Sequence, residues 1–105
     1  MLVISQNQLR LCNVNEIILQ IKGSPTEQEV KIKPLDSNLD LATYYSKDEA
    51  LKVFNNFISA QKRLYKLEHA KELLSPAEIE NIIQNDYLFQ FPEEKTIPRE
   101  EKYEI

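Results

Sequence analysis

The residue types that most often perform chemistry in proteins are scarce in this chain. His69 is the only histidine, and it follows Glu68 in a segment with a helical pattern. A Glu–His pair can act as general acid and base, but it needs a nucleophile placed to work with it, and we identify none. Cys12 is the only cysteine, which excludes an intramolecular disulfide and a multi-cysteine metal cluster. We therefore expect neither side chain to be catalytic or to bind a metal.

The motifs of nucleotide chemistry are also missing from the sequence. Loops that cradle phosphates depend on several glycines, because backbone N–H groups must approach the ligand closely. Gly23 is the only glycine of the chain. No serine lies in the strand–turn–helix context of a nucleophile elbow. We expect a protein that is not an enzyme and that needs no cofactor.

One segment has the composition of a nucleic-acid contact, because cations are interleaved with an aromatic side chain. Its residues are Lys62, Arg63, Tyr65, Lys66 and Lys71. Residues 46–71 carry six basic and three acidic groups, whereas residues 72–105 carry three and nine, within a total charge of −4. The acidic total opposes binding to a polyanion. Nucleic-acid binding through this segment is therefore the alternative to a protein-binding function.

A second candidate surface lies toward the end of the chain. The aromatic residues Tyr87, Phe89 and Phe91 share one face of a predicted strand. They fill the core unless a helix already covers that face, in which case some of them form an exposed patch for a partner. The acidic side chains that follow are suited to a basic partner surface. These are Glu93, Glu94, Glu100, Glu101 and Glu104.

The elements that position these residues begin with strands. Residues 1–45 have the period of two that is typical of strands with one face on a core; Leu2 and Ile4, for example, alternate with Val3 and Ser5. Short connections rich in turn-forming residues favour an antiparallel meander. A closing strand ends at Pro92. The predicted strands are residues 2–5, 9–12, 17–21, 30–33, 39–45 and 87–91.

Two helices are predicted between the last two strands. Ser46 and Glu49 have the spacing of a capping box, which starts a helix that continues to about Leu73. Its apolar stripe should lie across one face of the sheet. That stripe consists of Ala50, Leu51, Phe54, Phe57 and Ile58. A second capping box, Ser75-Pro-Ala-Glu78, opens a short helix. The predicted fold class is therefore α+β.

The domain organisation follows from length and composition. With 105 residues, the chain is suited to one core, which we place in residues 1–92, followed by an acidic, proline-containing tail at 93–105 that is extended or disordered. No apolar run approaches the length of a membrane span, so no membrane association is expected. With one thiol and no signal-peptide pattern, we expect a cytoplasmic protein.

Three segments together resemble a group of short, uncharacterised proteins encoded by bacteriophages and prophages of Gram-positive bacteria. They are the opening Leu2-Val-Ile-Ser-Gln6, the strand-to-helix junction Leu41-Ala-Thr-Tyr-Tyr-Ser-Lys-Asp-Glu-Ala-Leu51, and the closing Tyr87-Leu-Phe-Gln-Phe-Pro-Glu-Glu94. The resemblance implies an accessory protein of a mobile element that acts in the host cell, with no activity, cofactor or catalytic residue to transfer.

The residues and this resemblance together lead to three functional hypotheses. The first is a non-catalytic protein that contacts a host or phage protein, for example by filling the nucleic-acid groove of a defence nuclease with its acidic tail. The second is the nucleic-acid binding described above. The third, weaker hypothesis is an oligomer that sequesters a small nucleotide. Open strand edges also invite pairing between copies, so a homodimer is compatible with each of them.

Overall fold

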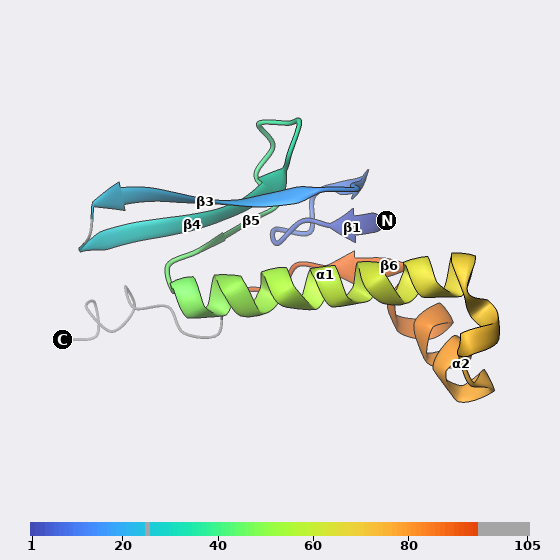
Figure 1. Cartoon of the computed structure of the whole chain (residues 1–105). Helices are drawn as coiled ribbons and strands as arrows, with labels where there is room; N and C mark the ends of the chain where they lie inside the picture. Colours follow the sequence, from blue (N-terminus) through green and yellow to red (C-terminus); the bar gives the residue numbers. More distant parts are fainter. Residues whose placement is uncertain (25, 95–105) are drawn as a thin grey trace.

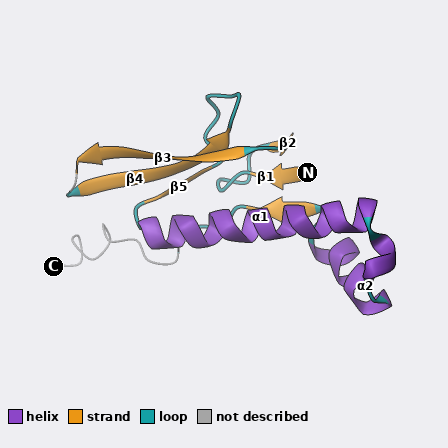
Figure 2. Cartoon of the chain, in the orientation of Figure 1, coloured by secondary structure: helices purple, strands orange, loops and turns teal. Residues whose placement is uncertain are grey.

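The computed structural model describes residues 1–24 and 26–94, and it confirms the α+β class (Figure 1). A long helix runs along the strands, and a short second helix lies beyond its C-terminal end (Figure 2). The strands are β1 Leu2–Ile4, β2 Leu11–Asn13, β3 Ile17–Ser24, β4 Glu27–Pro34, β5 Ala42–Tyr44 and β6 Leu88–Gln90. The α-helices are α1 Lys47–His69 and α2 Pro76–Asn85.

The strands form two three-stranded sheets, with the orders β2-β1-β6 and β3-β4-β5, in place of one continuous meander. The β3-β4-β5 sheet is an antiparallel meander, and β1 and β2 form an antiparallel hairpin. The closing strand β6 is parallel to β1, with Leu2 opposite Leu88. A parallel pair needs a long connection, and the chain between β1 and β6, which contains the other sheet and both α-helices, provides it. Sequence periodicity does not report which strand β6 will join.

Gln6 connects the two sheets. Its backbone N–H donates to the Leu41 carbonyl at 2.7 Å, and its side-chain oxygen accepts the N–H of Thr43 at 2.9 Å. Because Thr43 lies in β5, these bonds satisfy backbone groups at the edge of the β3-β4-β5 sheet. Gln6 therefore links the opening hairpin to the second sheet through both its side chain and its backbone.

The predicted alternation of β1 is confirmed, and the structure decides which set of side chains faces the core. Val3 and Ser5 are fully buried, whereas Leu2 is half exposed. In the other sheet the inward set includes Ile17, Val30 and Ile32. A period of two does not by itself identify the inner face when both sets contain apolar residues.

The hairpin between β3 and β4 depends on Gly23. This residue has a φ of +97°, a conformation that side chains other than that of glycine rarely adopt. A β-carbon at this position would also collide with the backbone oxygen of Glu27. The only glycine of the chain therefore has a structural role.

The helix α1 begins at the predicted residue but is capped in a different way. The Ser46 hydroxyl accepts the Glu49 N–H at 3.3 Å, which is the first half of the expected capping box. The Ser46 N–H, which we expected Glu49 to bind, donates instead to the Glu94 carboxylate at 2.7 Å. A residue 48 positions away therefore completes the cap.

The inner stripe of α1 is rotated slightly from the predicted one. Ala50 and Phe57 are buried as expected, but Leu51 is partly exposed. The buried residues of the helix are Ala50, Val53, Phe57, Ala60 and Leu64. The helix packs against a core that combines both sheets, with Tyr44, Phe57, Phe91 and Ile32 among its largest fully buried side chains.

The chain leaves α1 at His69, earlier than the predicted end near Leu73. Ala70 has a non-helical conformation, and Lys71–Leu73 forms a single 3-10 turn. The second capping box is confirmed, because Ser75 and Glu78 each bind the other's backbone N–H. The helix α2 then returns the chain toward β6, and its Ile82 side chain is buried.

Candidate functional site

The outer face of the β2-β1-β6 sheet carries a cluster of exposed aliphatic side chains. Leu2 lies opposite Leu88, and Ile4 lies opposite Leu11, so the four side chains occupy adjacent positions on one side of the sheet. Leu2, Leu11 and Leu88 are 45%, 65% and 47% exposed. We call Leu2, Ile4, Leu11 and Leu88 the leucine face. It is an apolar surface assembled from three strands.

The inner face of the same sheet holds the aromatic residues predicted as partner contacts. Phe91 is fully buried, and its ring is stacked on that of Phe57 with centroids 5.8 Å apart. Phe89 meets the Phe57 ring edge-on at 5.4 Å. Tyr87 is different, because it is 50% exposed. Of the three aromatic residues, the structure therefore leaves Tyr87 most available to a partner.

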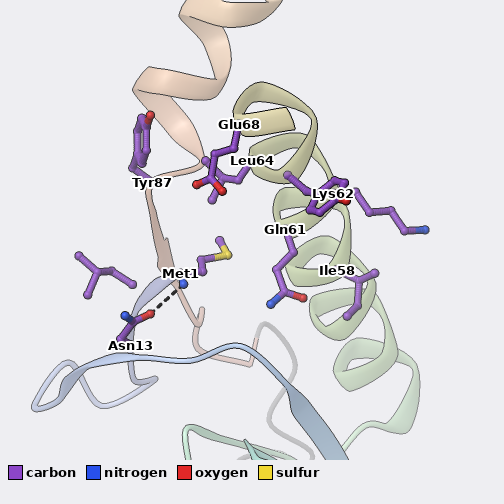
Figure 3. A pocket seen from close by; sticks show the side chains of 10 residues that line it. Met1, Asn13, Ile58, Gln61, Lys62, Leu64, Glu68 and Tyr87 are labelled. Atoms are coloured by element: carbon purple, nitrogen blue, oxygen red, sulfur yellow. Dashed lines mark hydrogen bonds between the residues drawn. The ribbon is translucent and has the colours of Figure 1, made fainter. Parts of the chain in front are cut away.

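An open pocket of about 660 Å³ lies between the start of β1 and the C-terminal half of α1. Figure 3 shows Tyr87 on one side, Gln61 and Leu64 of α1 on the other, and Met1 between them. The Met1 amine donates to Asn13 at 2.8 Å. The described lining combines apolar side chains, such as Met1, Ile58 and Leu64, with a few polar ones, as in a site that receives a partner side chain.

The pocket contains part of the predicted basic segment. Tyr65 and the stem of Lys62 line it, but the Lys62 ammonium points outward, away from Asn13 (Figure 3). Glu68 lies on the same wall. The described lining contains one lysine, Lys62, and one carboxylate, Glu68, which would repel the phosphates of a nucleotide. The lining residues that suit a nucleotide base are therefore Tyr65 and Tyr87.

The structure divides the remaining members of the basic segment. Arg63 binds Asp86, with nitrogen–oxygen distances of 2.7 and 3.0 Å. Lys66 borders a separate small hollow next to α2, and Lys71 lies in the 3-10 turn. Tyr65 is exposed, and its ring contacts the His69 ring at a tilt of 40°, with centroids 4.3 Å apart. Lys62, Tyr65 and Lys66 remain on the surface of α1, whereas Arg63 already has an anionic partner.

The Arg63–Asp86 pair fixes α2 against α1. The Asp86 side chain is almost completely buried, whereas about half of the Arg63 side chain is exposed. The hydrogen bond to Asp86 raises the pKa of the Arg63 guanidinium, against a smaller effect of burial. Burying a carboxylate is unfavourable without a partner, and the two-pronged guanidinium contact satisfies both of its oxygens. Arg63 therefore has a structural role in holding α2 against α1.

The acidic residues near the end of the chain also have distinct roles. Both oxygens of Glu94 accept backbone N–H groups, from Tyr45 at 2.8 Å and from Ser46 at 2.7 Å. Glu93 is exposed. Glu100, Glu101 and Glu104 lie outside the described residues, as does most of the predicted tail. Glu94 is thus occupied in the fold, and Glu93 is the described acidic candidate that remains on the surface.

Tyr44 lies near the start of α1, and its phenol has a strongly shifted pKa. Its hydroxyl donates to the Pro92 carbonyl at 2.6 Å, and the residue is fully buried. Burial, followed by the nearby Glu49 and Glu94 carboxylates, raises the pKa of the Tyr44 phenol. The neutral phenol can donate a hydrogen bond, and a phenolate cannot. Tyr44 therefore ties β5 to the segment after β6.

The two residues considered for catalysis, His69 and Cys12, have different surroundings in the described part of the chain. The closest ion-pair contact of His69 is with Glu68, at 4.0 Å on the surface. Cys12 is half-buried beside a hollow of about 480 Å³ whose described lining contains no cation, although thiol activation depends on cationic surroundings. No group of three potential ligands gathers among residues 1–24 and 26–94. No described helix is both long and apolar enough to cross a membrane.

The leucine face is the surface that the sequence did not reveal. A signal was present, because Leu2 neighbours Val3 and Leu88 neighbours Phe89, so apolar residues fall on both faces of β1 and β6. Such strands are expected to be covered on both sides. The helix covers the inner side, and nothing in the described chain buries Leu11 on the outer side.

Comparisons with known proteins identified no relatives. No protein-family model matches the chain, and neither a curated protein nor a solved structure matches it.

Proposed function

We propose that this chain is a non-catalytic accessory protein that acts by binding another protein through the leucine face. The observation that carries the proposal is the exposed, cross-strand arrangement of Leu2, Leu11 and Leu88. Single exposed leucines are ordinary on protein surfaces, but adjacent ones form a patch that a partner can bury. The setting that we propose is a mobile element in a Gram-positive bacterium, with the protein in the host cytoplasm.

The sheet gives this surface a rigid shape. Val3 and Phe89, on the opposite side, pack into the core, so the backbone that carries the leucines is fixed before a partner binds. A surface that is already ordered loses little conformational entropy on binding. Polar residues at the same sheet positions, Asn13 and Gln90, border the leucines. An apolar centre with a polar rim is the usual composition of a protein interface.

The proposed partner is a host protein with an apolar surface or groove. The exposed Glu93 and the acidic residues beyond it make a basic border on that partner favourable. A nucleic-acid-binding protein of the host, such as a defence nuclease, has surface charge of this kind. Inhibition of such an enzyme is the form of the proposal that is most direct to measure.

The test uses the full-length chain and compares two double variants. Leu11→Glu with Leu88→Glu places charges in the leucine face, and Leu35→Glu with Leu73→Glu places the same charges at exposed leucines elsewhere. Proteins retained from a Gram-positive host lysate are identified, and each is purified. Its dissociation constant is then measured with every variant by calorimetry. We expect the first variant to weaken binding at least about a hundredfold, because charged groups would be buried unpaired.

The control determines the meaning of this result. The Leu35→Glu/Leu73→Glu variant should bind the purified partner within about twofold of the original chain. Equal binding by all three proteins would refute the leucine face as the contact, as would equal losses in both variants. Circular dichroism spectra must agree among the three, so that a loss of binding is not a loss of folding.

Nucleic-acid binding is the second candidate, supported by the exposure of Lys62, Tyr65 and Lys66 on α1. Its test is the binding of labelled single-stranded DNA and RNA at low salt. Lys62→Gln combined with Lys66→Gln should abolish the binding, and Lys47→Gln combined with Lys52→Gln serves as the control on the same helix. Affinity should also fall steeply as salt increases. A chain that binds neither polymer at low salt excludes this candidate.

A further inference from the structure

The strand β3 forms an open edge of the β3-β4-β5 sheet. It pairs with β4 on one side over all eight of its residues, and no described strand pairs with its other side (Figure 1). The opposite edge, β5, differs because backbone groups there already have partners. Gln6 accepts the Thr43 N–H, and Glu94 accepts the N–H of Tyr45 directly after the strand. An edge that is long, regular and aliphatic favours pairing with another strand.

The hydrogen bonds show which residues of β3 have outward-facing backbone groups. The Leu35 N–H donates to the Glu16 carbonyl at 3.0 Å, so the backbone groups of Glu16 point toward the β4 side. In antiparallel pairing this direction alternates along the strand. Ile18, Gln20 and Lys22 therefore face β4. The backbone N–H and carbonyl groups of Ile17, Leu19 and Ile21 face the open edge.

The bonds of β4 agree with this assignment. The Ile32 carbonyl accepts the Leu41 N–H at 2.8 Å, on the side of β4 that faces β5. Ile32 lies opposite Leu19 in the β3–β4 pair. The pair Leu19–Ile32 therefore shares no backbone hydrogen bonds, and Leu19 directs its own groups outward. Leu19 is the middle one of the three outward residues.

The side chains of β3 are self-complementary about Leu19. If two copies pair antiparallel with Leu19 opposite Leu19 of the second copy, Ile17 lies opposite Ile21 of that copy. The same register places Glu16 opposite Lys22 of the second copy. Neither Glu16 nor Lys22 makes an ion pair within the described part of the chain. Both side chains are exposed and available.

Neighbouring registers lack this match. Two-fold symmetry requires a residue to lie opposite its own copy, so the alternatives are centred on Ile18 or Gln20. With Ile18 at the centre, Lys22 lies opposite Val14. With Gln20 at the centre, Lys22 lies opposite Ile18, and Glu16 lies opposite Ser24. Only the register on Leu19 joins opposite charges at both ends and aliphatic side chains between them.

We infer that this protein forms a symmetric dimer in which the β3 edges of two copies pair antiparallel with Leu19 on the two-fold axis. The pairing joins the two β3-β4-β5 sheets into one continuous sheet. Ile17, Leu19 and Ile21 form an apolar ladder on the helix-covered face, while Glu16 and Lys22 form two symmetry-related ion pairs on the other face. The leucine face belongs to the other sheet, so each copy retains its own.

The first experiment measures the dimer by sedimentation velocity over a range of concentrations. Lys22→Glu places two glutamates opposite each other, and Glu16→Lys does the same with two lysines. Because symmetry doubles each change, either variant should weaken dimerisation about tenfold. The exchange Glu16→Lys with Lys22→Glu restores opposite charges and should return the dissociation constant to within about threefold of the original. Recovery in the double variant is specific to this register.

The second experiment maps the register by disulfide formation. In a Cys12→Ala background, single cysteines replace Ile18, Leu19 or Gln20. A hydrogen-bonded cross-strand pair brings α-carbons to about 5.5 Å, within disulfide range, whereas diagonal positions are about 7–8 Å apart. Leu19→Cys should therefore form the disulfide-linked dimer under mild oxidation at least about tenfold faster than the other two variants.

Three results would overturn the inference. The first is a chain that stays monomeric at every concentration. The second is a dimer whose dissociation constant ignores the Glu16 and Lys22 variants. The third is a dimer that is lost in the Leu11→Glu/Leu88→Glu variant, since this would place the second copy on the leucine face. That third result would mean that the β3 edge is not the dimer contact. Binding of a host protein to the leucine face is tested separately, with the purified partner, so the two proposals can fail independently.

Discussion

The side chains of residues 88–94 fall into two groups, one that points into the molecule and one that points outward. On the inner side, Phe89 and Phe91 pack around Phe57, the Pro92 carbonyl accepts the Tyr44 hydroxyl, and Glu94 caps α1. On the outer side, Leu88 and Gln90 are exposed. Neighbouring residues of one short segment thus serve two different purposes.

The difference shows that residue type alone does not predict the role of a side chain here. Leu88 is apolar but exposed, whereas Glu94 is charged yet binds two backbone N–H groups within the fold. The inner side should determine stability, because its contacts exist only in the folded chain. The outer side should determine binding, because its contacts are incomplete without a partner.

The largest expected effect is that of Phe91→Ala. Removing a fully buried aromatic ring leaves a cavity beside Phe57, so the free energy of unfolding should fall by about 3–5 kcal/mol in urea denaturation. Phe91→Leu, which retains more volume, should cost less. If Phe91→Ala unfolds at the same urea concentration as the original chain, the inner side does not have the assigned role.

The next effect is that of Glu94→Ala. This variant leaves the N–H groups of Tyr45 and Ser46 without their charged acceptor, which should cost about 2 kcal/mol in the same measurement. Glu93→Ala is the matched control and should change stability by less than about 0.5 kcal/mol, since Glu93 is exposed. Equal effects of the two substitutions would contradict the comparison.

Tyr44→Phe should have a smaller effect that depends on pH. At pH 7 the loss of the hydroxyl bond to Pro92 should cost about 1 kcal/mol. Burial and the nearby carboxylates raise the pKa of Tyr44, so the folded chain holds the phenolic proton more tightly than the unfolded chain. This contribution is complete below the ordinary tyrosine pKa of about 10 and is lost as the pH rises above it.

The measurement for Tyr44 is the midpoint of thermal unfolding between pH 8 and 11. The difference between the original chain and Tyr44→Phe should shrink at the alkaline end. Tyr65→Phe, at an exposed tyrosine, should follow the original chain at every pH. A gap that stays constant across this range would show that Tyr44 deprotonation does not contribute.

The smallest expected effect on stability is that of Leu88→Ala. Its side chain is already half exposed, so the free energy of unfolding measured in urea should change by less than about 0.5 kcal/mol. The same variant should weaken binding to the proposed partner, which calorimetry detects. A substitution that destabilises the chain as strongly as Phe91→Ala would mean that the leucine face is part of the core.

Much of the fold was predictable because its signals are local. Ser46 and Ser75 start helices through bonds to residues three positions away, and Gly23 permits a turn that other residues resist. The end of α1 was harder to predict. No glycine or proline separates His69 from Leu73, so the break at Ala70 has no local sequence signal.

The candidate site was less predictable, because its residues meet only across long separations. In the sequence, the members of the basic segment are alike, but in the structure Arg63 binds Asp86. The acidic residues are likewise alike in the sequence, but Glu94 binds the Ser46 N–H. In both cases one member of a group of like charges has a partner that the sequence does not identify. Interactions of this kind depend on the crossover that brings β6 beside β1.

By itself the sequence determined the element types, their order and the α+β class, since periodicity and capping act over a few residues. The tertiary structure alone decided that the strands divide into two sheets, that β6 runs parallel to β1, and that Val3 rather than Leu2 faces the core. The physical reason is that a strand with apolar residues on both faces can bury either one. Only the packing of α1 on one side selects which leucines stay exposed.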